Sequence, residues 1–294
     1  RTYMKIVNID EGVVPLDLYD FQLDIMKSVV HNRFSICKMP RQSGKTTTMV
    51  AVILWFILFN ESFNCAILAN KASTAREILS RLQMAYEWLP HWLQQGLVEW
   101  NKGSLELENG SKVLASSTSS SAIRGGSFSL VYLDEFAFVD SQLQEEFFAS
   151  VYPTISSGRT SRVMITSTPK GMNLFYKLWV DAEEGRNEYV PIQVHWSAVP
   201  GRDEEWKEQT IKNTSEEQFR QEFECDFIGS SNTLINPSKL AALTFHEPIS
   251  QNEDMKIWKE NERGHVYAIS VDTSRGIGND YSAFTVVDCT SVPY

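Results

Sequence analysis

Cysteine is scarce in this sequence and forms no motif. The four cysteines, Cys37, Cys65, Cys225 and Cys289, lie far apart in the chain, and no two of them form a C-x-x-C pair. This pattern is typical of reduced cytosolic thiols and argues against both a disulfide framework and a cysteine-based zinc site. The five histidines include no H-E-x-x-H pattern, so the sequence gives no basis for zinc chemistry.

Long apolar runs and internal repeats are missing as well. The longest apolar run, Met49–Phe59, has 11 residues, whereas a membrane-spanning helix needs about 20. We therefore expect a buried helix there and no membrane partner. No secretory segment opens the chain, which begins at Arg1 instead of a methionine, so we expect a fragment. The lack of a repeat of about 20–50 residues argues against a solenoid.

An excess of positive charge is absent too. The chain carries a net charge of −10, from 27 basic and 37 acidic residues. Residues 1–180 hold 17 Lys and Arg against 16 Asp and Glu, whereas residues 181–294 hold 10 against 21. A protein that coats nucleic acid depends on Lys and Arg to neutralise phosphates. The bulk charge gives no support to such a coat, and any contact with nucleic acid must use a local surface.

The composition that is present is that of an ordinary globular protein. Of the 294 residues, 43% are hydrophobic and 22% charged, which suits one large domain or two modest ones. Within the first 180 residues, short β-rich runs alternate with longer helical stretches. Strands are expected at residues 34–37, 64–69, 130–133 and 162–166, and helices at about residues 46–59 and 73–89. This alternation predicts an α/β domain with a largely parallel sheet, whose functional groups gather beyond the carboxyl ends of the strands.

Turn and linker signals divide the rest of the chain. The Asn109-Gly110 pair lies between alternating segments and tolerates the positive φ of a type I′ turn, which predicts a hairpin. From about residue 181 to 227 the pattern becomes helical and heavily charged. Gly229–Asn232 then indicates a linker. Runs typical of strands return at residues 265–271 and 282–287.

The sharpest motif is the loop PRQSGKT, residues 40–46. A P-loop follows the pattern G-x-x-x-x-G-K-[ST], and this sequence keeps Gly44-Lys45-Thr46 but has Met39 in place of the first glycine. The physical logic is retained, because backbone N–H groups before a helix cradle phosphate, Lys45 neutralises phosphate oxygens and Thr46 offers its hydroxyl to Mg²⁺. The expected strand before the loop and the apolar helix after it favour nucleotide binding over a helix start without a ligand.

A pair of carboxylates supplies the second signal. The apolar run Leu130–Leu133 ends in Asp134 and Glu135. Asp134 is placed to hold Mg²⁺, directly or through water, and Glu135 to orient and deprotonate the attacking water. By itself, a strand that ends in Asp-Glu is usually only a polar strand end. Downstream of a P-loop in the same α/β domain it indicates a Walker B element, and the two motifs predict Mg²⁺-dependent hydrolysis of a nucleoside triphosphate.

Three weaker features accompany these motifs. The pair Phe21-Gln22 is suited to stacking on adenine and bonding its edge, although a core Phe beside a surface Gln explains it equally well. The hydroxyls of Thr166–Thr168 follow an expected strand, where they either sense the γ-phosphate or form an ordinary turn. Arg41 in the loop and Arg124 in a glycine turn are both candidates to stabilise charge on the γ-phosphoryl group. An ordinary surface arginine is the alternative for Arg124.

The C-terminal part offers a second pair of carboxylates. Asp272 follows an apolar strand, and Asp280 comes shortly after it. A strand-borne Asp that faces a second carboxylate suits a two-metal nuclease. An Asp in a strand-end turn is far commoner than a metal ligand, so the spacing alone leaves both interpretations open.

Together, these motifs resemble the large terminase subunit of T-even-type tailed bacteriophages. The resemblance rests on Phe21-Gln22, PRQSGKT, the stretch Val98–Gly110, the IRGGSF and VYLDEFAF block and TSTPKG, in the family's order over nearly the whole chain. In that family, an N-terminal RecA-like ATPase drives double-stranded DNA into an empty capsid, and a C-terminal RNase H-like nuclease cuts the concatemer. The family's P-loop is itself a variant form, so Met39 is no departure from it.

The resemblance implies roles for the residues of the ATPase motifs. The implied ATP-binding set comprises Phe21, Gln22, Arg41, Gln42, Ser43, Gly44, Lys45, Thr46 and Thr47. The implied Mg²⁺ ligands are Thr46 and Asp134, the catalytic carboxylate is Glu135, and the coupling motif is Thr166, Ser167 and Thr168. Arg124 matches the trans-acting arginine finger of the wider terminase family, and Arg41 acting in cis is the alternative.

The resemblance also implies a domain organisation. Residues 1–228 would form a RecA-like (ASCE) P-loop ATPase domain, with a small lid-like helical subdomain from about residue 181. Residues 229–234 would be a linker, and residues 235–294 the start of an RNase H-like nuclease domain. Asp272 and Asp280 match the first ligands of the nuclease's Mg²⁺ or Mn²⁺. The family's later carboxylates would lie beyond the last residue, so we expect an incomplete nuclease site.

The partners implied are double-stranded DNA, the portal protein of the procapsid and the small terminase subunit. The resemblance further implies a homo-oligomeric ring on the portal, in the cytoplasm of the infected bacterium and transiently docked on the procapsid.

Two other functions remain to be weighed against this one. A superfamily-two helicase also has an aromatic–Gln motif and a Walker pair, but it needs a second RecA-like domain, which residues 234–294 do not begin convincingly. A nucleotide-dependent scaffold that binds ATP without turnover has no need of Glu135, the water-activating carboxylate.

Overall fold

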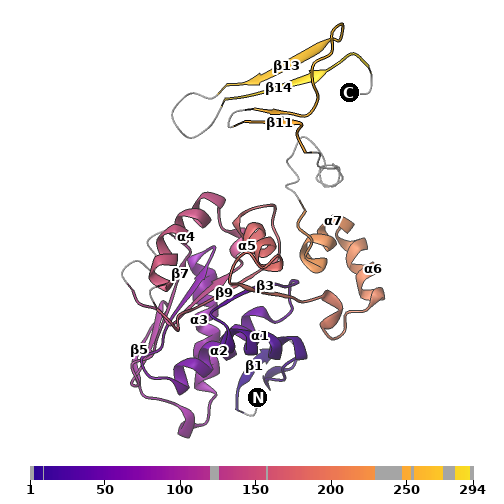
Figure 1. Ribbon diagram of the computed structural model, residues 1–294. Coiled ribbons are helices and arrows are strands. Elements are labelled where there is room, and N and C mark those ends of the chain that lie inside the picture. The colour runs from indigo at the N-terminus through magenta and orange to yellow at the C-terminus, as the bar shows by residue number, and fades with distance from the viewer. Residues whose placement is uncertain are drawn as a thin grey trace. The chain divides into compact units, whose positions relative to one another are not determined.

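The computed structural model describes residues 3–8, 10–119, 126–156, 158–228, 247–252, 255–273 and 282–291. The chain divides into two compact units, one up to residue 240 and the other from residue 241. Figure 1 shows the helices and strands of both units. Among the residues just named, no helix is long and apolar enough to cross a membrane.

An eight-stranded sheet forms the centre of the first unit. In spatial order its strands are β10 (Val190–Gln193), β3 (Phe34–Lys38), β9 (Arg162–Ser167), β8 (Leu130–Asp134), β4 (Asn64–Ala69), β7 (Lys112–Ser117), β6 (Ser104–Leu107) and β5 (Leu97–Trp100). The strands from β10 to β7 run parallel, and β6 and β5 add an antiparallel edge. The largely parallel sheet that the strand–helix alternation predicts is confirmed.

Helices cover both faces of this sheet, so its central strands β3, β4, β8 and β9 are buried along nearly their whole length. Neighbouring residues of a strand alternate between two cores. Tyr132 belongs to the core formed with α1 (Asp20–His31), α2 (Lys45–Phe59) and α3 (Ala72–Glu87). Leu133 belongs to the core formed with α4 (Ser141–Ser156) and α5 (Leu174–Glu183). The two groups of helices lie on opposite sides of the sheet (Figure 1), which gives a three-layer α/β architecture.

The apolar run that predicts a buried helix forms most of α2, a helix of 15 residues buried around most of its circumference. The hairpin predicted at Asn109-Gly110 is confirmed between β6 and β7, with Gly110 at a φ of +79°. Asn109 also reaches the end of α2, where its Nδ2 donates to the carbonyls of Ile57 at 2.8 Å and Asn60 at 3.1 Å. The hairpin therefore caps the helix that begins at the P-loop.

A short helical segment follows the last strand of the sheet. It consists of the 3₁₀ turn η3 (Trp196–Ala198), α6 (Glu204–Asn213), α7 (Glu216–Phe219) and the π-helical turn η4 (Arg220–Glu224). The sequence predicts a helical subdomain from about residue 181, but α5 ends at Glu183 and β10 pairs with β3 inside that range. The helical segment thus begins later than expected, because a four-residue edge strand with a central proline gives little β signal.

The remaining elements are short. In the first unit, β1 (Lys5–Asn8) pairs with β2 (Gly12–Pro15), and the 3₁₀ turns η1 (His91–Leu93) and η2 (Phe136–Phe138) follow α3 and β8. In the second unit, β11 (Ser250–Gln251) pairs with β12 (Lys256–Ile257), and β13 (Tyr267–Asp272) pairs with β14 (Ala283–Asp288), all antiparallel. The two strands predicted at residues 265–271 and 282–287 are confirmed as β13 and β14.

Candidate nucleotide-binding site

Two residues with positive φ shape the loop between β3 and α2. Gln42 has a φ of +54° and Gly44 a φ of +78°. A Cβ on Gly44 would lie 2.5 Å from Nε2 of Gln22, so glycine is required both for its backbone angle and for space. Ser43 is fully buried and donates from Oγ to the Pro40 carbonyl at 2.8 Å. The loop is thereby fixed at the N-terminus of α2, where backbone N–H groups and the helix dipole favour an anion.

Gln22 supports this loop from α1. Its Nε2 donates to the Gly44 carbonyl at 3.4 Å, and its Oε1 accepts from the Tyr19 backbone N–H at 3.0 Å. The side chain is only 3% exposed, so the alternative of a surface glutamine is wrong. Phe21 is partly buried against the core of α1–α3. A role of the Phe21-Gln22 pair in binding adenine stays a prediction.

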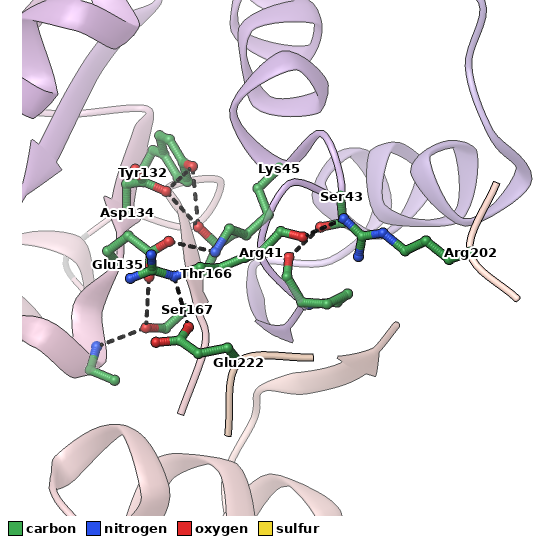
Figure 2. A network of polar contacts seen from close by, with 12 residues as sticks. Arg41, Ser43, Lys45, Tyr132, Asp134, Glu135, Thr166, Ser167, Arg202 and Glu222 are labelled. Carbon is green, nitrogen blue, oxygen red and sulfur yellow. Dashed lines mark hydrogen bonds and ion pairs between the residues drawn. The ribbon is translucent and has the colours of Figure 1, made fainter. Parts of the chain in front are cut away.

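Lys45 and Glu135, which lie 90 residues apart in the sequence, form an ion pair. Their Nζ and Oε1 atoms are 2.5 Å apart. The pair forms because β9 alone separates β3 from β8, so that the loops after these parallel strands open at the same edge of the sheet. Glu135 has a φ of +50°, unusual for a residue with a side chain. The structure thus brings the P-loop and the strand-end carboxylate together (Figure 2).

Asp134 is buried and held by two hydroxyl groups. The Tyr132 hydroxyl donates to its Oδ1 at 2.7 Å, and the Thr166 hydroxyl donates to the same oxygen at 3.0 Å. Burial raises the pKa of the Asp134 carboxyl and the charge of Glu135 raises it further, whereas Lys45 lowers it. The sequence motifs do not predict the contact of Tyr132 with Asp134, although strand alternation places both residues on the same face of β8.

The residues expected to form the coupling motif contact both carboxylates. Thr166 bonds Asp134 as described, and Ser167 Oγ lies 3.5 Å from Oε2 of Glu135 and accepts from the Ala137 backbone N–H at 3.1 Å. The Ser167 carbonyl also accepts from the Met39 N–H at 3.1 Å. The Thr168 hydroxyl is buried and finds no hydrogen-bond partner in the described part of the chain. The end of β9 therefore touches both the P-loop and the Walker B segment.

The helical segment also contacts the P-loop. It does so through two residues, Glu222 and Arg202, that belong to no sequence motif. Glu222 pairs through Oε2 with Nε of Arg41 at 2.8 Å, and its carbonyl accepts from the Arg41 N–H at 3.0 Å. Arg202 donates from Nη2 to the carbonyls of Arg41 at 2.8 Å and Gln42 at 3.1 Å. Both residues are more than 150 positions from the loop, and no local sequence pattern predicts contacts over such a separation. Figure 2 shows them converging on the loop.

An open cavity of about 530 Å³ lies at this edge, large enough for a small-molecule ligand. It is lined by Arg41, Gln42, Ser43, Gly44, Lys45, Thr46, Thr47, Asn70, Thr74, Arg81, Glu135 and Phe138. The described residues contain no group of three or more side chains suited to holding a metal by themselves. A Mg²⁺ ion that arrives with a nucleotide needs only one or two protein oxygens. Thr46 and Asp134 supply oxygens of this kind, so the residues present fit a Mg²⁺–nucleotide.

Some predicted site residues are not brought to this place. Arg124, Asp280 and the linker at 229–234 lie outside the described residues. Asp272 ends β13 in the second unit, where it is exposed and pairs with Ala283. Its role as a metal ligand stays a prediction.

Comparison with known proteins identifies related chains. A family model described as terminase large subunit, T4likevirus-type, N-terminal, matches residues 36–242. The large terminase subunits of Thermus phage G20c and Thermus virus P23-45 are each 28% identical over 181 residues, and each match covers 56% of this chain and 35% of the other protein. The chain thus spans about a third of the length of these curated relatives.

Solved structures of terminases share the fold. The large terminase ATPase domain of Thermus phage P74-26 superposes with a TM-score of 0.58 at 20% identity, covering 72% of this chain and 94% of that one. The HK97 bacteriophage large terminase gives a TM-score of 0.66 at 17% identity, covering 97% of this chain and 62% of that one. These likenesses, together with the parallel sheet, show a RecA-like α/β fold.

Proposed function

Because this chain belongs to the T4-type large terminase subunit family, we propose that residues 1–228 are an ATP-hydrolysing motor domain that moves double-stranded viral DNA into a procapsid. The observation that carries the proposal is the 2.5 Å pair of Lys45 and Glu135 at the 530 Å³ cavity. A phosphate-binding lysine beside a strand-end carboxylate is the arrangement that nucleoside triphosphate hydrolysis requires.

In this proposal the P-loop and the two strand-end carboxylates have separate tasks. Backbone N–H groups of the loop and the Lys45 ammonium bind phosphate oxygens, and Thr46 and Asp134 would hold Mg²⁺. When bound, Mg²⁺ neutralises charge on the phosphates. Phosphate competes with Glu135 for Lys45, which frees the Glu135 carboxylate to take a proton from the attacking water.

Two arginines are candidates for stabilising the charge on the γ-phosphoryl group. Arg124 would act from a neighbouring subunit of a ring assembled on the portal protein, and Arg41 would act within its own subunit. Arg41 pairs with Glu222 through Nε at 2.8 Å and lines the cavity, so the terminal nitrogens of its guanidinium group are left to bind a phosphate. Thr166–Thr168 would couple the nucleotide state to movement, a role supported by their contacts with both carboxylates.

We further propose that residues 235–294 begin an RNase H-like endonuclease that cuts concatemeric DNA in the complete protein. Asp272 and Asp280 would be its first ligands for Mg²⁺ or Mn²⁺, and a two-metal site needs further carboxylates. Residues 1–294 should therefore leave supercoiled plasmid intact in either metal. Cleavage of the plasmid that persists in Asp272→Ala would contradict the assignment.

The proposed partners are double-stranded DNA, the portal protein and the small terminase subunit, in the cytoplasm of the infected host. An ATPase assay with DNA, with and without empty procapsids, tests the motor. We expect hydrolysis to rise when DNA and procapsids are both present. An ATP hydrolysis rate that changes with neither DNA nor procapsids would contradict the motor role. A folded protein that hydrolyses no ATP would contradict the proposed ATPase activity.

A further inference from the structure

Tyr132 occupies a place on β8 where a phenylalanine would fill the core equally well. Its ring is fully buried among apolar side chains of the core formed with α1–α3. A hydroxyl in such surroundings is destabilising unless it finds a hydrogen-bond partner. Here the partner is the carboxylate of Asp134, two residues along the same strand and on the same face.

The hydrogen bonds around Asp134 have a definite direction. Tyr132 Oη lies 2.7 Å and Thr166 Oγ1 3.0 Å from Oδ1, and the two hydroxyl oxygens lie 3.1 Å from each other. Each hydroxyl has one proton to donate. When both hydroxyls donate to Oδ1, neither has a proton left for a hydrogen bond to the other hydroxyl. Both donors therefore converge on one oxygen of the carboxylate, as the dashed lines of Figure 2 show.

The second carboxylate oxygen is left for another partner. Within the described part of the chain, no side chain donates a hydrogen bond to Oδ2 of Asp134. Two donors from different strands, β8 and β9, fix the plane of the carboxylate, since Asp134 and Thr166 are opposite each other in the parallel register. The two hydroxyls therefore hold Oδ1 of Asp134, and Oδ2 is left to bind another partner.

We propose that Tyr132 and Thr166 are positioning residues that orient Asp134 so that Oδ2 faces the nucleotide-bound Mg²⁺. This inference rests on the proposed function of the site. Groups that hydrogen-bond a metal ligand from behind fix its orientation, and their removal typically lowers metal affinity about 10–100-fold. Thr166 would thus act on the metal ligand itself, in addition to any part in coupling.

Manganese binding tests the inference without reference to turnover. Mn²⁺ replaces Mg²⁺, and electron paramagnetic resonance of free Mn²⁺ measures its affinity for the full chain with a non-hydrolysable ATP analogue. We expect Tyr132→Phe, which keeps the ring and removes the hydroxyl, to weaken Mn²⁺ binding about tenfold. Binding of the analogue without metal should be unchanged, because Tyr132 is not among the residues that line the P-loop cavity.

A matched control separates orientation from stability. Tyr189 is another buried tyrosine, in the core formed with α4 and α5, and its hydroxyl finds no partner among the described residues. Tyr189→Phe should leave Mn²⁺ affinity as in the wild type. Thr166→Val and Thr166→Ser provide a second pair, because only serine keeps a hydroxyl. We expect valine to weaken Mn²⁺ binding and serine to retain most of it.

Each outcome decides between the explanations. Wild-type Mn²⁺ affinity in Tyr132→Phe and Thr166→Val would show that the hydroxyls serve only the stability of the core, and would overturn the inference. If Tyr132→Phe does not fold, the two Thr166 variants decide the question in the same way. Absence of metal-dependent nucleotide binding by the wild-type chain would instead overturn the proposed function, so the two failures are distinguishable.

Discussion

At the residue scale, the site is built on backbone angles that few side chains tolerate. Gln42, Gly44 and Glu135 all have positive φ, at +54°, +78° and +50°. For Gln42 and Glu135, which carry side chains, such a conformation typically costs about 1–3 kcal/mol and persists where the surroundings enforce it, whereas glycine adopts it readily. Two lie in the P-loop and the third turns the Glu135 carboxylate toward Lys45. Among the described residues, two of the four non-glycine positions with positive φ therefore lie where phosphate and water would meet.

The glycine of the P-loop gives a first prediction. Gly44→Ala must place a Cβ 2.5 Å from Gln22 at a φ of +78°, so we expect both a loss of stability greater than about 1–2 kcal/mol and weaker nucleotide binding. Gly12 is the matched control, since it has a φ of +76° with open space around it. Urea unfolding measures the stability of Gly44→Ala and Gly12→Ala, and titration with nucleotide measures their affinity. Comparing the two variants separates the effect of the backbone angle from that of the contact with Gln22. Equal effects on nucleotide binding would contradict this explanation.

The thiols give a second prediction, which depends on pH. Burial raises the pKa of Cys37 and Cys65 far above the ordinary range and that of Cys225 to about 12. Only the thiolate reacts, and a raised pKa keeps these groups protonated up to a higher pH. We expect Cys289, which is partly exposed, to react quickly with a disulfide reagent at pH 8. The other three should stay unreactive up to pH 10 until denaturant is added, and fast reaction of two or more thiols in the native chain would refute this.

Residues within motifs could be predicted from the sequence, whereas their partners could not. Lys45, Asp134 and Glu135 stand out because their types and spacing carry chemistry. Arg202 and Glu222 do not stand out, because an Arg or Glu in a charged helical segment is normally a solvated surface residue. Their contacts with the P-loop depend on how the chain folds back, and no local pattern encodes that.

At the element scale, α2 is held at both ends. Gly44 is its N-cap, and the carbonyls of Ile57 and the C-cap Asn60 accept hydrogen bonds from Asn109 of the hairpin between β6 and β7. Helix ends leave carbonyls without intrahelical partners, and buried ends need an outside donor. The hairpin therefore supports the helix that presents the P-loop.

This contact gives a third prediction. Asn109→Ala removes both donors to the end of α2, and at roughly 1 kcal/mol for each hydrogen bond the free energy of unfolding should fall by about 2 kcal/mol. Asn109→Asp keeps the oxygen that accepts from the Ser111 N–H at 3.0 Å. It replaces the donors with a charged oxygen that faces two carbonyls at a helix C-terminus, so it should lose at least as much. Urea unfolding measures both. A fall in the alanine variant alone would place the stabilisation in the turn and not in the helix cap.

The central elements of the fold could be predicted because their signals are local. β3, β4, β8 and β9 each contain a short run rich in apolar residues, and most of α2 is an apolar run too long for a strand. β10 could not be predicted, because four residues with a proline become a strand only through pairing with β3. The strand order, with β9 between β3 and β8, is likewise a long-range property. That order is what brings Lys45 to Glu135.

At the scale of the whole molecule, the proposal that Arg124 acts in trans requires neighbouring subunits. If Arg124 acts in trans, Glu135→Gln and Arg124→Ala chains should each be inactive alone. Mixing them should restore some ATP hydrolysis, because intact Glu135 then meets intact Arg124 at mixed interfaces. Steady-state hydrolysis of mixtures with procapsids measures this.

A matched mixture controls that prediction. If Arg41 acts within its own subunit, a mixture of Glu135→Gln and Arg41→Ala chains should stay inactive. No subunit in that mixture has both Glu135 and Arg41, and a neighbouring subunit cannot supply the missing Arg41. Failure of the Arg124 mixture in demonstrably assembled rings would contradict the trans role and favour Arg41 acting in cis.

The most direct measurement for the central claim compares nucleotide binding with turnover in Glu135→Gln. We expect this variant to bind ATP about as tightly as the wild type and to hydrolyse it at least ~100-fold more slowly, since loss of a general base typically costs that much. Glu106→Gln is the control, because Glu106 also pairs with a lysine, Lys112 at 2.7 Å, but lies on β6 outside the cavity. It should hydrolyse ATP at the wild-type rate. Wild-type turnover by Glu135→Gln would contradict the role of Glu135 as the general base.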